Sequence, residues 1–188
     1  NNNFDFSIND SFKNNLEKDN FKIKKQNIDY IIFTSGSTGK PKQIFLKDEG
    51  IVQVVLGQAK ILNLNNNKET GVSKFLWLLN SAFDASLSDI YATLLTGNEL
   101  YITNHKPNKI KTIIQYLNNY DITHVDLPPI TLPLYANYKE KLPFKLNVII
   151  GGELSNENTI KELMKERQIC FYNAYGPSET TICTQLSK

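Results

Sequence analysis

The amino-acid sequence predicts an α/β fold, in which a mostly parallel sheet is flanked by helices. Short apolar runs of the strand type alternate with segments of helical spacing, and the connections between them are short. Several of these runs end at glycine or proline residues, which interrupt regular structure. Strands that alternate with helices pair in parallel, and ligands bind at the carboxyl ends of such strands. We therefore expect the functional residues directly after the predicted strands.

The first part of the chain divides into a polar lead-in, residues 1–28, and the beginning of a core that covers 29–188. The lead-in is rich in Asn, Lys and Asp, and one short helix is expected around 12–16. Two strands follow, at 30–34 and 43–47, with a loop rich in Gly, Ser and Thr between them. Residues 51–62 then show the apolar spacing of a helix.

The rest of the core carries the alternation that predicts the parallel sheet. Strands are expected at 75–79, 100–102, 122–126, 146–150 and 169–172. A helix that ends near Gly97 is indicated by four apolar residues on one helical face: Leu87, Ile90, Tyr91 and Leu94. Two further helices are expected, one at 110–117 and one at 155–166 with Ser155 as its N-cap.

The composition argues against several classes of function. The net charge of +2 is near balance and the lysines are spread along the chain, so we expect no nucleic-acid partner. Two cysteines in 188 residues do not make a disulfide framework, which favours a reducing compartment. The sequence shows no signal-peptide pattern, and no apolar run approaches the length of a membrane span. We therefore expect a cytoplasmic protein with no membrane partner.

Residues 34–42 form a segment that is suited to hold a polyphosphate. It combines hydroxyl residues, glycines and lysines: Thr34, Ser35, Gly36, Ser37, Thr38, Gly39, Lys40, Pro41 and Lys42. Glycines let backbone N–H groups approach an anion, hydroxyls add hydrogen-bond donors and lysines add charge. The pattern differs from a Walker A loop, because Thr34 replaces its first glycine and Pro41 follows Lys40. On composition alone, a phosphate loop and a plain turn between two hairpin strands are equally supported.

A second segment, residues 173–181, brings an amide, an aromatic ring, a hydroxyl and a carboxylate together after a predicted strand. The ring of Tyr175 could stack on a base, the amide of Asn173 could read the edge of a base, and Glu179 could bind Mg²⁺. A Gly-Pro turn with the tyrosine packed on the core explains the same residues without a ligand. On this segment alone, that simpler interpretation is favoured.

Residues 31–42 resemble the phosphate loop of the adenylate-forming superfamily, which includes acyl-CoA ligases, luciferases and the adenylation domains of nonribosomal peptide synthetases. The turn at 173–181 is similar to a second motif of that superfamily, and Gly151-Gly152-Glu153 completes the set. Two departures are Gln43, where the family usually has Gly, and Ser178, where Thr is commoner. The resemblance implies a flavodoxin-like subdomain of an adenylate-forming enzyme, an ATP-dependent ligase that releases AMP.

The resemblance also implies roles for individual residues. The segment 34–40 and Lys42 would bind the phosphates of ATP. Glu179 would bind Mg²⁺, and it would act in catalysis together with Lys42 and Ser178. The adenine would lie among six residues: Gly152, Glu153, Asn173, Ala174, Tyr175 and Gly176.

Asp84 bears on whether the substrate is an amino acid. It precedes a predicted helix and could simply be an N-cap, for which Asp is a favoured residue. The segment Phe83-Asp84-Ala85-Ser86 also resembles amino-acid-activating adenylation domains, in which this Asp holds the α-ammonium group, and we prefer that role. The substrate pocket, within residues 74–183, would then be lined by nine residues: Asp84, Ala85, Ser88, Asp126, Ile149, Gly151, Ala174, Ile182 and Cys183.

Asp126 is the unusual member of this pocket, because a buried carboxylate needs a hydrogen-bond donor or a cation. A phenol, an indole N–H or an amino group on the substrate could satisfy Asp126. We therefore favour tyrosine or tryptophan as the substrate, and a basic amino acid is the close second. A bond from Asp126 to the protein itself would weaken both assignments.

The implied reaction joins the amino acid to AMP and then passes it to the phosphopantetheine thiol of a carrier-protein domain beside other synthetase modules. The family continues with a ribose-binding Asp, a hinge and a small C-terminal domain, and this chain stops at Lys188. We therefore expect residues 29–188 to be part of an adenylation core, an internal fragment of the large N-terminal subdomain with little activity alone. The rival interpretations are an acyl-CoA or aryl-acid ligase, and a flavodoxin-like binding module without catalytic activity.

Overall fold

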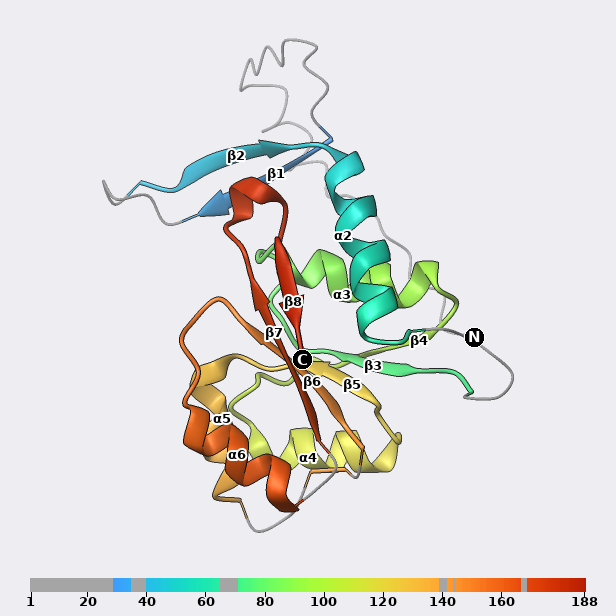
Figure 1. Cartoon of the computed structure of the whole chain (residues 1–188), viewed down its shortest axis with the longest axis vertical. Coiled ribbons are helices and arrows are strands. Elements are labelled where there is room, and N and C mark those ends of the chain that lie inside the picture. The colour runs from blue at the N-terminus through green and yellow to red at the C-terminus, as the bar shows by residue number, and fades with distance from the viewer. Residues whose placement is uncertain (1–28, 35–39, 65–70, 139–141, 144, 167–168) are drawn as a thin grey trace, which may run out of the picture.

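The computed structural model describes residues 29–34, 40–64, 71–138, 142–143, 145–166 and 169–188. Within these ranges the strands form a six-stranded sheet and a separate two-stranded hairpin (Figure 1). The helix expected around 12–16 and the predicted loop residues 35–39 lie outside the described residues.

The hairpin consists of β1 (Tyr30–Thr34) and β2 (Lys42–Leu46), which pair antiparallel with Thr34 opposite Lys42. Alternate residues of its strands are buried, among them Ile32 and Ile44, as expected for a strand pair with one covered face. Both strands were predicted to within one residue. The pairing brings the two ends of the segment 34–42 side by side.

The larger sheet has the strand order β4-β3-β5-β6-β7-β8. Its members are β3 (Lys74–Trp77), β4 (Glu99–Ile102), β5 (His124–Asp126), β6 (Asn147–Gly151), β7 (Cys170–Tyr175) and β8 (Gln185–Ser187). All neighbours from β4 to β7 are parallel, and only β8 joins antiparallel at the edge. The predicted mostly parallel sheet is confirmed. β8 was not predicted, because this short polar segment has no apolar run.

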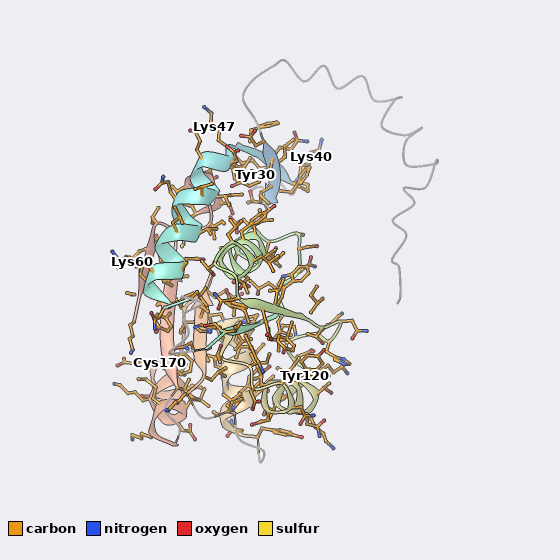
Figure 2. All side chains as sticks on the ribbon, turned by 90° about the vertical axis from the view of Figure 1, so that its right-hand side faces the viewer. Tyr30, Lys40, Lys47, Lys60, Tyr120 and Cys170 are labelled. Carbon is orange, nitrogen blue, oxygen red and sulfur yellow. The ribbon has the colours of Figure 1, made fainter. Side chains whose placement is uncertain are left out.

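Helices cover both faces of this sheet (Figure 1). On one face lie α2 (Asp48–Ile61) and α3 (Ala85–Leu95), and on the other α4 (Ile110–Asn119), α5 (Leu132–Ala136) and α6 (Glu157–Glu166). Successive strand residues point to opposite faces, so Leu76 packs against the second group of helices and Phe75 against the first. Figure 2 shows α2 running from Lys47, beside the hairpin, to Lys60 near the sheet.

The helix α3 has its polar side buried. The helix was predicted, but two residues of its apolar face, Tyr91 and Leu94, are 42% and 51% exposed. The buried side carries small hydroxyl side chains, which are satisfied within the helix: Ser88 donates to the carbonyl of Ala85 at 2.8 Å. Because these hydrogen bonds replace bonds to water, the hydroxyl side chains of α3 can be buried.

Two local features correct the sequence analysis. The N-cap of α6 is Asn156 and not Ser155, because the Asn156 Oδ1 atom accepts hydrogen bonds from the backbone N–H groups of Asn158 and Thr159. Between β5 and β6, the turn η1 (Pro129–Thr131) and the short helix α5 were not predicted. Their few residues do not complete the periodic pattern on which a helix is recognised.

His124 ties α2 to the centre of the sheet. Its Nε2 atom donates to the carbonyl of Leu62, the residue after α2, at 3.1 Å, and its ring stacks on Phe75. The side chain is buried, and burial lowers the pKa of His124 to about 4, so the ring is neutral at pH 7. The unfolded chain takes up a proton near pH 6.5, whereas the folded chain resists it. The contribution of His124 to stability is therefore complete above pH 6.5 and is lost as the pH falls towards 4.

Replacing His124 by Gln should remove this pH dependence. Between pH 7.5 and pH 5, the free energy of unfolding of the wild type should fall by about 2 kcal/mol relative to the variant. Urea denaturation at the two pH values measures the difference. The matched control is His105→Gln, because His105 is exposed. Parallel pH curves for the wild type and His124→Gln would contradict this account.

Candidate functional site

Two neighbouring cavities open where the central parallel strands end. One has a volume of about 680 Å³ and the other of about 260 Å³. They share a wall formed by Gly152, Glu153, Ala174 and Gly176. This wall lies at the ends of the neighbouring strands β6 and β7, which end at Gly151 and at Tyr175. The position at the carboxyl ends of parallel strands is the one predicted.

The larger cavity contains every residue that the sequence assigned to an adenine site: Gly152, Glu153, Asn173, Ala174, Tyr175 and Gly176. Gly152 has φ = +79°, a conformation that side chains disfavour, and it turns the chain from β6 towards α6. Tyr175 lines this cavity and is 68% exposed, so it is not packed into the core. The turn can therefore offer an aromatic face to a ligand, and the simpler interpretation of a core tyrosine does not hold.

The smaller cavity contains every residue that the sequence assigned to a substrate pocket: Asp84, Ala85, Ser88, Asp126, Ile149, Gly151, Ala174, Ile182 and Cys183. They come from the start of α3, the ends of β5 and β6, and the chain after β7. These segments are far apart in the sequence. The fold thus joins them around one space of a size that suits a small ligand.

Gln58 also lines the smaller cavity and was missed. It lies on α2, is buried, and its Nε2 atom donates to the Cys183 Sγ atom at 3.4 Å. A signal for it does exist in the sequence. Gln58 falls on the same helical face as Val55 and Leu62, and a polar residue within an apolar stripe marks a buried site with a special partner.

Asp84 is only partly explained as a helix cap. Its Oδ1 atom accepts from the backbone N–H of Ala85 at 2.8 Å. The next two N–H groups, the usual partners of an N-cap, donate instead to the backbone carbonyls of Phe83 and Asp84. The Oδ2 atom is buried and has no hydrogen-bond partner within the described residues. One oxygen of a cavity-lining carboxylate is thus left for a donor.

The chain after β7 is held in an uncommon conformation. Thr181 and Ile182 have φ values of +67° and +65°, which β-branched residues rarely adopt. The conformation turns the chain back after η2 (Ser178–Thr180), and it places Ile182 and Cys183 on the cavity wall. Such strain is commonly found at functional sites.

Gly176 also allows the chain to turn back after β7, because without a side chain it lets the segment at Cys183 and Thr184 pack directly against it. A Cβ atom on Gly176 would lie 2.5 Å from the Cys183 Cα atom and 2.6 Å from the Thr184 backbone nitrogen. Gly151 is in a similar position, since its Cβ atom would lie 2.6 Å from the carbonyl oxygen of Ala174. Both glycines are therefore required by the approach of two backbone segments.

Lys42 and Glu179, both assigned to catalysis from the sequence, are in direct contact. The Lys42 Nζ atom lies 2.8 Å from Glu179 Oε1, and this hydrogen bond lowers the pKa of Glu179. The contact joins the hairpin to η2, which begins with the third assigned residue, Ser178. Lys40 is exposed, as Figure 2 also shows, and Thr34 ends β1. The positions of Ser35, Gly36, Ser37, Thr38 and Gly39 lie outside the described residues.

The described residues contain no cluster of three or more acidic, His or Cys side chains that would hold a metal by itself. Mg²⁺ usually binds through one or two carboxylates together with the phosphates of a substrate. The exposed carboxylate of Glu179, next to the hairpin, fits this simpler requirement.

Asp126 is buried at the end of β5, and burial raises its pKa to about 7. A second acidic residue, Asp89, lies on the buried side of α3. Burial and the nearby charge of Asp126 raise the pKa of Asp89 well above the usual range. Asp89 was not among the predicted site residues. The reason is that the apolar stripe of α3 was expected to mark its buried side.

No helix in the described part of the chain is long and apolar enough to cross a membrane.

Comparison with known proteins gives consistent findings. The family model of AMP-binding enzymes matches residues 3–188. Bacitracin synthase 3 of Bacillus licheniformis is 35% identical over 156 residues, which cover 82% of this chain and 2% of the relative. Gramicidin S synthase 1 of Brevibacillus brevis is 32% identical over 161 residues, which cover 85% of this chain and 14% of the relative. The chain thus spans a small part of the curated relatives that it matches.

Solved structures share the fold. The N-terminal subdomain of Klebsiella oxytoca NpsA, in complex with 3-hydroxybenzoyl-AMSN, matches with a TM-score of 0.71 at 22% identity over 84% of this chain and 38% of that chain. A four-domain nonribosomal peptide synthetase bound to AMP and glycine matches with a TM-score of 0.74 at 22% identity, over 86% of this chain and 12% of that chain.

Proposed function

Because the family model matches nearly its whole length, this chain belongs to the AMP-binding enzymes, and we propose that it is part of an amino-acid adenylation domain of a nonribosomal peptide synthetase. The observation that carries the proposal is the smaller cavity, where Asp84 presents a buried carboxylate oxygen that has no hydrogen-bond partner among the residues described. Such an oxygen needs a donor, and an α-ammonium group supplies one together with a positive charge. The relatives that match the sequence are peptide synthases, which agrees with this substrate class.

The reaction proposed for the site is the transfer of AMP to a carboxylate. An oxygen of the amino acid carboxylate forms a bond to the α-phosphorus of ATP, and the bond from that phosphorus to the bridging oxygen of the β-phosphate breaks. Pyrophosphate leaves with the electron pair of that bond. In the second step, the thiol of a phosphopantetheine arm on a carrier-protein domain displaces AMP and gives a thioester. Catalysis rests on positioning and on stabilising the charge that develops.

The residues of the larger cavity and the hairpin would hold the nucleotide. Tyr175 and the backbone of Gly152 offer faces for the adenine, and the amide of Asn173 offers hydrogen bonds to its edge. The segment 34–42 would hold the departing pyrophosphate, with Lys42 and Ser178 beside it. Mg²⁺ held by Glu179 would reduce the charge of the phosphates when bound. In this structure Lys42 forms an ion pair with Glu179. When ATP binds, this ion pair would have to break, so that Lys42 can bind phosphate and Glu179 can bind Mg²⁺.

The side-chain part of the substrate would lie in the smaller cavity. Asp126 selects for a polar tip, which tyrosine, tryptophan and the basic amino acids provide. We place the reaction in the cytoplasm, where Cys183 on the cavity wall would stay a free thiol.

A second candidate is an aryl-acid ligase. The matched NpsA structures hold hydroxybenzoyl and anthranilyl ligands, whose names show no α-ammonium group. Such a substrate could offer the Asp84 Oδ2 atom only a neutral donor, a phenol or an aromatic amine, whereas an α-ammonium group also supplies a positive charge, and for that reason we favour the amino acid.

The test is ATP–pyrophosphate exchange by the full-length protein that carries this chain, screened with all proteinogenic amino acids and with hydroxybenzoic acids. One amino acid should raise the exchange at least about tenfold over the background without it. Exchange that depends on an aryl acid would instead support the second candidate. If neither class of acid stimulates exchange, the proposal is wrong.

A further inference from the structure

The first turn of α2 contains a glycine, Gly50, although glycine is less favourable in a helix than alanine. An isolated glycine in a helix usually has a packing reason. At Gly50 a Cβ atom would lie 2.6 Å from the Thr181 Oγ1 atom, 3.1 Å from its Cγ2 atom and 3.2 Å from its Cβ atom. The buried side chain of Thr181 thus rests on the backbone of Gly50. Gly50 provides a seat for Thr181 that any other residue would fill with its own Cβ atom.

Thr181 belongs to a strained part of the chain, residues 178–183, which we call the turn segment. Thr181 and Ile182 have φ values of +67° and +65°. The N–H of Cys183 donates to the carbonyl of Thr181 at 2.8 Å, which makes Ile182 the centre of a γ-turn. With positive φ this turn is rare and strained, above all at a β-branched residue. Such strain persists only where the surrounding structure holds the segment in place.

Three contacts join the turn segment to the hairpin and to α2, at its beginning, its middle and its end: Lys42 Nζ with Glu179 Oε1 at 2.8 Å, Gly50 with Thr181, and Gln58 Nε2 with Cys183 Sγ at 3.4 Å. Figure 1 shows the turn between β7 and β8, in red, beside the hairpin and the start of α2. The first contact is an exposed ion pair and the last is a weak bond to sulfur. The middle contact is the firm one, because it is buried and two atoms cannot overlap.

The start of α2 is itself fixed to the hairpin. Lys47, at the N-cap position of α2, has no side-chain acceptor for the helix N–H groups. The backbone N–H of Asp48 donates instead to the Asp29 Oδ2 atom at 3.0 Å, and Asp29 directly precedes β1. The contact between Gly50 and Thr181 therefore sets the turn segment relative to the hairpin.

We propose that Gly50 is a positioning residue for the reaction, because it seats Thr181 against α2 and so holds the turn segment where both parts of the site need it. The inference rests on the proposed function, since it concerns how that site is built. One end of the turn segment carries Glu179 beside the hairpin, and the other carries Ile182 and Cys183 on the wall of the smaller cavity. Gly50 is not among the residues that line the two cavities, so it acts on both ligands through Thr181.

The first test measures the position of the turn segment without any ligand. Gly50→Ala places a methyl group in the seat of Thr181. Rotation of the Thr181 side chain would leave its Cβ atom tight at 3.2 Å, so we expect the turn segment to move away from α2. The bond from Gln58 to Cys183 should then be lost, and alkylation of Cys183 by iodoacetamide should become at least about fivefold faster. Cys170 on β7 is the internal reference, read in the same protein by site-resolved mass spectrometry.

The second test measures ATP–pyrophosphate exchange by the full-length protein. In Gly50→Ala the KM values for ATP and for the amino acid should each rise at least about fivefold, because both ends of the turn segment move. A loss of folded protein alone would lower the apparent kcat and leave both KM values unchanged. Gly57→Ala is the matched control on the same helix, where the new Cβ atom meets no other segment of the described residues within 4 Å. It should keep the wild-type KM values and alkylation rate.

Rescue by a second substitution distinguishes a direct contact from a general disturbance. Thr181→Gly removes all three atoms that the new methyl group would meet, and glycine accepts a φ of +67°. The double variant Gly50→Ala/Thr181→Gly should have KM values and a Cys183 alkylation rate within about twofold of those of Thr181→Gly alone. If Gly50→Ala does not fold, the double variant should fold, and its failure to fold would overturn the inference.

The outcomes separate this inference from the proposed function. Wild-type KM values in a folded Gly50→Ala protein would overturn the inference and leave the proposed function intact, even if Cys183 reacts faster. An unchanged alkylation rate of Cys183 would overturn it as well. If the wild type exchanges pyrophosphate with no acid, the proposed function is wrong, whereas faster alkylation in Gly50→Ala would still show that Gly50 seats the turn segment.

Discussion

Replacing Asp84 by Ala is expected to lower kcat/KM for the amino acid by about 100-fold or more in ATP–pyrophosphate exchange. In the proposed complex the α-ammonium group loses a charged partner in a site removed from water, which costs roughly 3–5 kcal/mol. The buried Oδ2 atom, unpaired within the described residues, is the atom that the ammonium group would meet. The KM for ATP should change little, because Asp84 lines only the smaller cavity.

The companion variant Asp84→Asn separates this role from helix capping. Asn is as good an N-cap as Asp, and it can still accept from the N–H of Ala85. Its free energy of unfolding should therefore match that of the wild type, whereas Asp84→Ala should lose about 1 kcal/mol. Exchange by Asp84→Asn should remain as low as that of the Ala variant. If Asp84→Asn exchanges pyrophosphate at the wild-type rate, then the charge of Asp84 is not needed and the residue serves only as a helix cap.

Gly176→Ala is expected to damage both cavities in a single step. The new Cβ atom would lie 2.5 Å from the Cys183 Cα atom, and a contact between two backbone segments cannot be relieved by a side-chain rotation. We expect the free energy of unfolding to fall by about 1–3 kcal/mol, as for other overpacked sites. The KM values for ATP and for the amino acid should rise together, since Gly176 lies in the wall that the two cavities share.

The same substitution at Gly57 provides the control. Gly57 is exposed on α2. Apart from its chain neighbours and the backbone of its own helix, no atom of the described residues lies within 4 Å of the position of its Cβ atom. Gly57→Ala should raise the free energy of unfolding by roughly 0.5–1 kcal/mol, because alanine restricts the unfolded chain and favours the helix. Urea denaturation measures both variants. A Gly176→Ala protein as stable as Gly57→Ala would contradict the packing described here.

The sequence predicts the strands and the position of the site well, for a physical reason. The apolar run 147–151 is buried within the sheet, and a glycine follows where the chain must turn, whereas in 30–34 alternate residues face the covered side of the hairpin. The residues assigned to an adenine site and to a substrate pocket, most of them within the motifs at 84–88, 151–153 and 173–183, each line one of the two cavities. Their roles towards ATP and the amino acid remain proposals.

The features that could not be predicted depend on contacts between distant residues. The buried side of α3 carries Ser and Asp in place of Leu and Tyr. Its hydroxyls are satisfied by backbone carbonyls about one turn earlier, and Ser88 lines the smaller cavity. Asp89 was missed for this reason, whereas Gln58 on α2 had a signal in the sequence as a polar residue within an apolar stripe. The pairing of Lys42 with Glu179 joins residues 137 positions apart, and the positive φ values at Thr181 and Ile182 have no local sequence signal.

The wall between the two cavities has a consequence for how this protein can evolve. It consists of Gly152, Glu153, Ala174 and Gly176, and three of these four have no side-chain atom beyond Cβ. Backbone geometry is inherited with the fold and is not altered by most exchanges of side chains. Ser88, Asp126 or Ile149 can therefore drift to other residues, and so change the preferred acid, without any change in the groups that would face adenine. The fold therefore allows the preferred acid to change while the wall between the two cavities keeps its geometry.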